Sequence, residues 1–84
     1  MASVEKILEQ VLRGTSDANV EFNDLRRLLL HLGFQERTSG GHHIFRRAGI
    51  PQLINLQRDG KKAKPYQVRQ VRRIIADHGL AQEL

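Results

Sequence analysis

The beginning of the chain repeats apolar residues with the period of an α-helix. Within residues 3–13 the apolar positions are Val4, Ile7, Leu8, Val11 and Leu12. This spacing predicts a helix with one apolar stripe, and Ser3 and Gly14 are suitable residues to begin and end it. A stripe of this kind can bind a partner protein, but it more often covers the protein's own core. The turn-rich residues 14–19 then predict a linker.

The same period predicts two more helices. The first covers residues 23–32, with Asn23 as its N-cap and Gly33 just past its C-terminal end. The last helix begins at Pro65, because a missing backbone N–H is tolerated at the first helical position. The apolar stripes of these two helices are Leu25, Leu28, Leu29 and Leu32 for the first, and Val68, Val71, Ile74 and Ile75 for the last.

Between these helices the pattern changes to that of a β-sheet. Residues 34–38, 42–47 and 52–57 have strand length, and turn signals separate them. This order predicts an antiparallel three-stranded meander in a single α+β domain, residues 1–84, with helices on one face of the sheet and the other face open. Ile44 and Phe45 are both apolar but must point to opposite faces, so the pattern does not decide which one is buried. Residues 58–64 are predicted to form a basic loop.

Positive charge is concentrated in the second and larger part of the chain. Residues 1–24 hold two basic residues and five acids, whereas residues 26–73 hold twelve basic residues and two acids. The formal net charge of the whole chain is +5. Charge distributed so unevenly is typical of a protein that binds nucleic acid or another polyanion, although it is also compatible with a solvated surface.

Length and composition exclude several classes of protein. With 84 residues the chain can build one modest core. It has no cysteine, which excludes disulfides, cysteine-based zinc sites and thiol nucleophiles. The N-terminal residues lack the order of a secretory signal, and no apolar run approaches the roughly 20 residues that cross a bilayer. We therefore expect a soluble, cytoplasmic protein that has no membrane partner.

The candidate chemistry lies in residues 39–47, Ser-Gly-Gly-His-His-Ile-Phe-Arg-Arg. Histidine changes its protonation near neutral pH, and His42 and His43 follow two glycines that permit close approach of the backbone to a ligand. A shared metal ion is disfavoured, because neighbouring strand residues point to opposite faces and no carboxylate pair is near. A Ser-His-acid catalytic triad is also poorly supported, since no serine or acid can be distinguished from ordinary surface residues. Both histidines can instead be ordinary strand residues, just as His31 is expected to be an ordinary exposed helix residue.

Two classes of function remain open on these residues alone. In the first, an imidazole takes the proton of a ribose 2′-hydroxyl, or gives one to the departing 5′-oxygen, while lysine or arginine stabilises charge on the phosphate. This is RNA cleavage without a metal ion or cofactor. In the second, the domain binds nucleic acid and cleaves nothing. The glycine turn that leads into the histidine strand favours the first class, because a protein that only binds does not need it.

The order of these segments resembles the HicA family, which are small toxins of bacterial toxin–antitoxin pairs that act as mRNA interferases. The resemblance runs from about Phe22 to Leu80 and leaves residues 3–13 as an additional helix. It depends on the helix that ends in Gly-Phe, on Gly-x-His before an apolar strand, on Ile-Asn-Leu-Gln, on the basic loop and on Lys-Pro-Tyr-Gln-Val-Arg-Gln-Val. For the core, residues 22–80, the family implies a fold like that of double-stranded-RNA-binding domains, with the order α-β-β-β-α.

The resemblance also implies site residues and partners. The family's catalytic histidine matches His42, so we expect a general acid/base role there and assign none to His43. Gly41 stands where the family usually has serine, so a phosphate would meet only its backbone N–H. The implied partners are mRNA and a cognate antitoxin of the HicB type that masks the active face. The residues expected to bind RNA or phosphate are Gly40, Gly41, Arg46, Lys61, Lys62, Lys64, Arg69, Arg72 and Arg73.

Overall fold

The computed structural model describes residues 2–84, which form a three-stranded antiparallel sheet, three α-helices and several short elements. In chain order these are α1 (Val4–Arg13), the 3-10 helix η1 (Asp17–Asn19), α2 (Phe22–His31), β1 (Gln35–Ser39), β2 (His42–Arg47), β3 (Ile50–Leu56), β4 (Arg58–Asp59), β5 (Lys62–Ala63), α3 (Pro65–Asp77) and the 3-10 helix η2 (Leu80–Glu83). The sheet has the strand order β1-β2-β3 of a meander. The predicted α+β fold, with α2 and α3 on either side of three strands in the sequence, is therefore confirmed.

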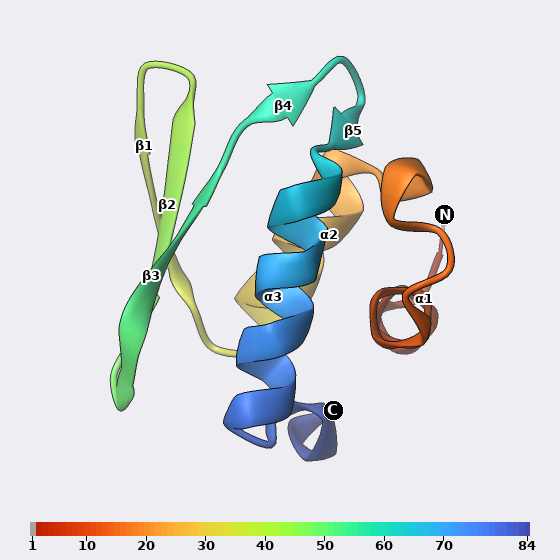
Figure 1. The fold of residues 1–84 in the computed structure, drawn as a ribbon. Helices are drawn as coiled ribbons and strands as arrows, with labels where there is room; N and C mark the ends of the chain where they lie inside the picture. Colours follow the sequence, from red (N-terminus) through yellow and green to blue (C-terminus); the bar gives the residue numbers. More distant parts are fainter. Residues whose placement is uncertain (1) are drawn as a thin grey trace.

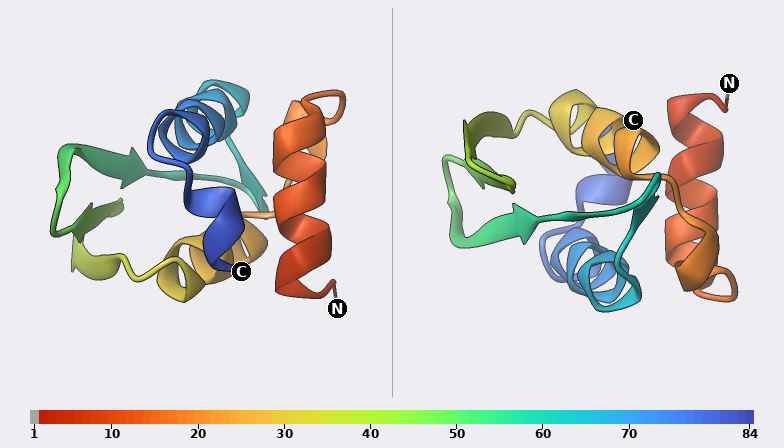
Figure 2. Two further views of the ribbon diagram at one scale, coloured as in Figure 1. Left: turned by 90° about the horizontal axis from the view of Figure 1, so that it is seen from below. Right: turned by 90° about the horizontal axis from the view of Figure 1, so that it is seen from above.

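The elements are arranged in three layers (Figure 1). The sheet forms one outer layer, α2 and α3 form the middle layer, and α1 packs against both of these helices on the side away from the sheet (Figure 2). One core joins the three layers, because Ile7 of α1, Leu28 of α2 and Phe45 of β2 are all fully buried in the same cluster. The face of the sheet that points away from the helices remains open.

The helix ends follow the predicted capping with one exception. The Ser3 hydroxyl accepts a hydrogen bond from the Lys6 backbone N–H at 3.2 Å, and α1 covers the core as expected. Gly14 and Gly33 both adopt the left-handed conformation, with φ of 73° and 85°. The prediction for Asn23 is wrong: α2 begins one residue earlier, and the Asn23 side chain instead accepts from Arg58 at 3.0 Å. Within residues 2–84 no helix is both long enough and apolar enough to cross a membrane.

The sheet register shows which of Ile44 and Phe45 is buried. Phe45 faces the helices and is fully buried, so its neighbour Ile44 lies half-buried on the open face. β3 begins at Ile50, two residues earlier than predicted, and its pairing with β2 contains a register shift between Phe45 and Arg47. Pro51 is tolerated in this strand because β3 is an edge strand.

The segment predicted as a basic loop, residues 58–64, is more ordered than expected. Arg58 and Asp59 of β4 pair with Ala63 and Lys62 of β5 in a short antiparallel hairpin. The Lys61 carbonyl accepts a hydrogen bond from the Phe22 backbone N–H at 2.9 Å, which joins this hairpin to the start of α2. The lysines of this segment are therefore presented by a hairpin that is fixed to the core.

Candidate functional site

The open face of the sheet carries alternate residues of the three strands. On β2 these are His42, Ile44 and Arg46, because the residues between them point toward the helices. Their partners in β1 are Ser39, Arg37 and Gln35, in the same order. Leu53 and Asn55 are the exposed residues of β3 on this face, and Leu53 is 59% exposed. The open face therefore combines a histidine, two arginines and a small apolar strip.

His42 lies at the start of β2, directly after the turn that joins it to β1. Gly40 has φ of 60°, whereas Gly41 lies outside the positive-φ region, a combination suited to a tight hairpin turn with glycine in its first central position. The His42 side chain is exposed, with its Nδ1 3.3 Å from Asn55 Oδ1 and its Nε2 3.2 Å from Gln57 Nε2. Lys64 Nζ lies 3.3 Å from Gln57 Oε1. These contacts place the imidazole at the rim of the open face, within reach of solvent and of a ligand.

His43 has a different environment on the other side of the strand. Its Nδ1 lies 2.8 Å from Glu36 Oε2, and its ring contacts the Phe22 ring edge-on with centroids 4.8 Å apart. The His43 side chain is only 19% exposed. His43 therefore fastens β2 to α2 and β1, and the structure gives it a packing role.

Glu36 connects this cluster to α2. Its carboxylate contacts His43 on one oxygen and Arg26 Nε at 2.6 Å on the other. Burial alone would raise the pKa of Glu36, but the hydrogen bonds from His43 and Arg26, together with their charges, outweigh burial and lower the pKa below its ordinary value of 4.5. The carboxylate is therefore stabilised in its charged form at neutral pH.

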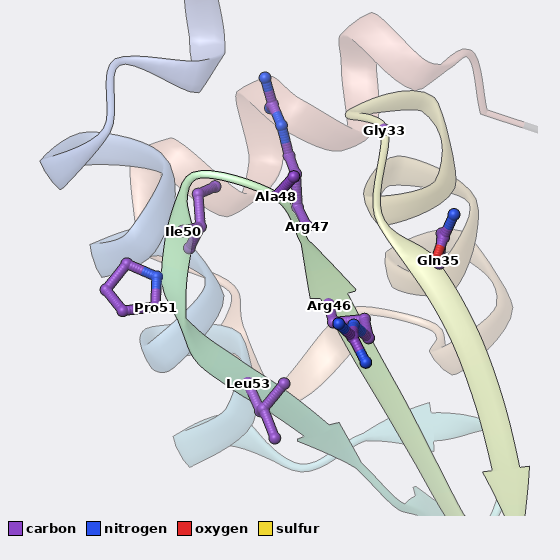
Figure 3. Close-up of a pocket in the computed structure, with 8 residues that line it drawn as sticks. All are labelled: Gly33, Gln35, Arg46, Arg47, Ala48, Ile50, Pro51 and Leu53. Atoms are coloured by element: carbon purple, nitrogen blue, oxygen red, sulfur yellow. The ribbon is translucent and has the colours of Figure 1, made fainter.

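A hollow on the surface lies at the other end of β2 from His42. It encloses about 530 Å³ near the turn between β2 and β3, with Arg46, Ile50, Pro51 and Leu53 among its lining residues (Figure 3). A second hollow of about 370 Å³ continues along the open face past Arg46, Leu53 and Ile44. The second hollow includes Ile44, the next open-face residue after His42, but His42 itself lines neither hollow.

The predicted phosphate-binding cations occupy several parts of the surface. Lys61 and Lys62 are exposed on the β4–β5 hairpin, and Arg69 and Arg73 are exposed on α3. Lys64, half-buried just before α3, is the one that the structure connects to His42, through Gln57. Gly40 and Gly41 form the exposed turn before His42, and Arg46 lies two positions beyond Ile44 on the same face.

Arg72 is placed differently from its neighbours Arg69 and Arg73. It was expected to bind RNA or phosphate, but its side chain is only 25% exposed and turns toward α1 and η1. Its guanidinium donates to both carboxylate oxygens of Asp17, at 2.9 and 3.1 Å, and to the Val11 carbonyl at 3.1 Å. The hydrogen bond to Asp17, and to a lesser extent its charge, outweigh burial and raise the pKa of Arg72. The guanidinium is not available to a phosphate while these contacts are formed.

Asn55 and Gln57 are site residues that the sequence analysis did not single out. The signal was present, because Ile54 and Leu56 alternate with them and are buried. Residues that alternate with buried positions must lie on the open face. Within residues 2–84 no group of three or more histidine, aspartate or glutamate side chains is arranged to hold a metal ion.

The comparisons with known proteins identify one match. Residues 22–80 match a protein-family model described as the HicA toxin of bacterial toxin–antitoxin systems. The matched segment begins at α2 and ends at the start of η2, so α1 and η1 lie outside it. Comparison with curated proteins and with solved structures gives no match.

Proposed function

Because the chain belongs to the HicA family of toxins from bacterial toxin–antitoxin systems, we propose that it is a metal-independent endoribonuclease that cleaves mRNA and so arrests translation. The observation that carries this proposal is the position of His42. The imidazole is exposed on the open sheet face, follows a glycine turn, and has Lys64 nearby through Gln57. A titratable group in reach of a substrate and a cation in reach of its phosphate are the two parts that such a cleavage needs.

The proposed reaction uses the 2′-hydroxyl of the RNA itself. His42 takes the proton of this hydroxyl while the 2′-oxygen forms a bond to the adjacent phosphorus. The bond from phosphorus to the 5′-oxygen breaks, and the departing oxygen takes up a proton from solvent. The products are a 2′,3′-cyclic phosphate and a free 5′-hydroxyl. Negative charge builds on the phosphate oxygens during this step, so donors aimed at them stabilise the transition state.

RNA would approach this site along the open face and over the cations around it. The exposed turn glycines would let backbone N–H groups approach the phosphate, and Lys64 would contribute charge next to His42. The remaining cations would bind phosphates away from the reacting bond and give affinity without sequence preference. The proposed surface consists of Gly40, Gly41, Arg46, Lys61, Lys62, Lys64, Arg69 and Arg73, and Arg72 is left out because Asp17 occupies its guanidinium.

A toxin of this family implies a cognate antitoxin. We propose that the antitoxin is of the HicB type and covers the open face, because Ile44 and the 59% exposed Leu53 offer apolar contacts between Arg37 and Arg46. Carboxylates of the partner would pair with these arginines and set the association rate and its salt dependence. Co-expression with the gene next to its own should relieve toxicity and yield a complex. Toxicity that persists without a complex would contradict this part of the proposal.

Incubation of the purified protein with an mRNA tests the nuclease proposal most simply. The RNA should be cleaved equally with and without EDTA, and the fragments should carry 2′,3′-cyclic phosphates. An RNA with a deoxyribose at each cleaved position should bind but remain intact, because it lacks the attacking hydroxyl. Binding of mRNA without any cleavage would show that the domain is a nucleic-acid-binding module instead.

A further inference from the structure

The side chains around His42 form a chain of hydrogen bonds with a defined direction. It runs from Lys64 Nζ to Gln57 Oε1 at 3.3 Å, from Gln57 Nε2 to His42 Nε2 at 3.2 Å, and from His42 Nδ1 to Asn55 Oδ1 at 3.3 Å. Each of these contacts pairs one donor with one acceptor only for a particular arrangement of the amides and of the imidazole proton. The direction can therefore be derived from the chemistry of the end groups.

Lys64 fixes the first amide. An ammonium group carries donors and no acceptor. It must therefore meet the carbonyl oxygen of Gln57, because the opposite orientation would place two donors face to face. The Gln57 amide N–H groups then point toward His42 Nε2. The Gln57 backbone N–H is held separately by Gln67 Oε1 at 3.2 Å, so the position of this residue does not depend on its amide contacts.

The orientation of Gln57 fixes the proton on the imidazole. A ring nitrogen that accepts from an amide N–H carries no proton, so a neutral His42 must carry its proton on Nδ1. Asn55 Oδ1 lies on that side and accepts it. All three contacts are satisfied by this single arrangement, in which Nε2 is the basic nitrogen.

From this geometry we infer that Gln57 and Asn55 are positioning residues that hold His42 as its Nδ1–H tautomer, with Nε2 as the atom that takes the substrate proton. Lys64 acts through Gln57 by fixing the orientation of its amide. In the RNA-free protein the Gln57 N–H donates a hydrogen bond to Nε2. A ribose 2′-hydroxyl that gives its proton to Nε2 would take the place of this N–H. The role of Nε2 as the base rests on the proposed nuclease function, whereas the assignment of the tautomer does not.

A histidine side-chain NMR spectrum of the RNA-free, 15N-labelled protein tests the tautomer directly. The measurement is made at alkaline pH, in the range where the imidazole signals no longer change with pH and the ring is therefore neutral. The His42 signals, identified by their loss in His42→Ala, should show a protonated Nδ1 and an unprotonated Nε2. An Nε2–H tautomer of His42 in the native protein would overturn the inference.

Two variants that add the same negative charge separate the effect of the tautomer from the effect of the added charge. Gln57→Glu places a carboxylate, which can only accept, against Nε2, so the proton should move to Nε2. Asn55→Asp places a carboxylate against Nδ1, where an acceptor already lies, so the tautomer should stay Nδ1–H. In cleavage assays Gln57→Glu should have a kcat at least roughly tenfold below that of Asn55→Asp, since a wrong tautomer removes the base.

The outcomes also separate this inference from the proposed function. The same tautomer in both variants, or equal kcat values with different tautomers, would overturn the positioning roles. Absence of cleavage by the native protein would reject the nuclease, while the NMR spectra would still report whether Gln57 and Asn55 set the tautomer. A circular dichroism melt of each variant is the control that tests whether the fold is retained.

Discussion

Arg72 of α3 and Asp17 of η1 form a two-point ion pair, with Nη1–Oδ1 and Nη2–Oδ2 distances of 2.9 and 3.1 Å. Arg72 also donates to the carbonyl of Val11, so a single guanidinium holds both the end of α1 and the turn after it. Asp17 and Val11 lie outside the segment that matches the family model, whereas Arg72 lies inside it. This ion pair therefore fastens the additional N-terminal helix to the family core.

Arg72→Ala and Arg73→Ala should have opposite effects although the two residues are neighbours. Loss of Arg72 leaves the largely buried Asp17 carboxylate without its partner, which should cost roughly 1–3 kcal/mol of unfolding free energy and change RNA affinity little. Arg73 is exposed, so its removal should leave stability almost unchanged. It should instead weaken RNA binding and lower the salt dependence by about one counterion. Thermal melts and binding titrations at two salt concentrations check this, and a larger loss of affinity in Arg72→Ala would contradict it.

Leu28→Ala should destabilise the domain strongly. Leu28 is fully buried in the core, so its truncation should cost about 2–5 kcal/mol of unfolding free energy. For a domain of this size, that corresponds to a melting temperature lower by roughly 10 °C or more. Leu30→Ala is the matched control, because Leu30 is on the same helix and is 38% exposed. Equal melting temperatures for the two variants would show that the core is packed differently.

The stability contributed by Glu36 should disappear in acid. Its pKa in the folded protein is lowered from the ordinary value of 4.5, the contacts with His43 and Arg26 outweighing the effect of burial. The unfolded chain therefore takes up a proton before the folded protein does, and stability falls as the pH falls through the lowered pKa. The difference in unfolding free energy between the native protein and Glu36→Gln should be large at pH 7 and should shrink as the pH falls below 4.5.

Denaturant titrations across this pH range measure that difference. Glu9→Gln, which replaces an exposed carboxyl on α1, supplies the baseline for an acid on the surface. A Glu36→Gln difference that does not change with pH would mean that the ion cluster around Glu36 does not stabilise the fold.

Gly41→Ser should be tolerated and Gly40→Ser should not. Nothing lies within 4 Å of a Cβ built on either glycine, but only Gly40 has a positive φ, at 60°. A side chain in that conformation costs roughly 1–2 kcal/mol. If a serine hydroxyl at position 41 binds phosphate, Gly41→Ser should raise the cleavage rate without a loss of melting temperature. Equal destabilisation by the two variants would contradict the conformation of this turn.

Local pattern was sufficient to predict most of the fold. The spacing of Val4, Ile7 and Leu8 predicted α1, and Ser3 caps it as expected, since these features depend on residues close together in the chain. The Asn23 prediction failed for a tertiary reason. Phe22 is buried at the start of α2 under His43 and Arg58, which draws the helix one residue back and turns the Asn23 side chain to Arg58.

The site was only partly predictable, because its geometry depends on contacts between distant segments. The alternation of strand residues predicted that His42 and His43 point to opposite faces of the sheet. It could not show which residues each histidine would contact. The amide partners of His42 come from the pairing of β2 with β3, in which His43 lies opposite Leu56. Arg72 was expected to bind RNA or phosphate, but it pairs with Asp17, which lies 55 residues earlier. No local pattern indicates a pair with that separation.

The role of His42 is tested most directly by separating RNA cleavage from RNA binding in one variant. His42→Ala removes the proposed base and leaves the basic surface intact. His31→Ala is the matched control, because it removes an exposed histidine of α2 that lies outside the proposed site. His43→Ala should lose less activity than His42→Ala, since its contacts with Glu36 and Phe22 support the fold.

The measurement is an RNA cleavage time course in EDTA, beside a binding titration with the same RNA. Cleavage by His42→Ala should fall roughly 10²–10⁴-fold, the usual contribution of general acid–base catalysis, while its affinity for RNA stays within a few-fold of the native protein. Full cleavage by His42→Ala would contradict the catalytic role of this histidine, and loss of native activity in EDTA would contradict the metal-independent mechanism.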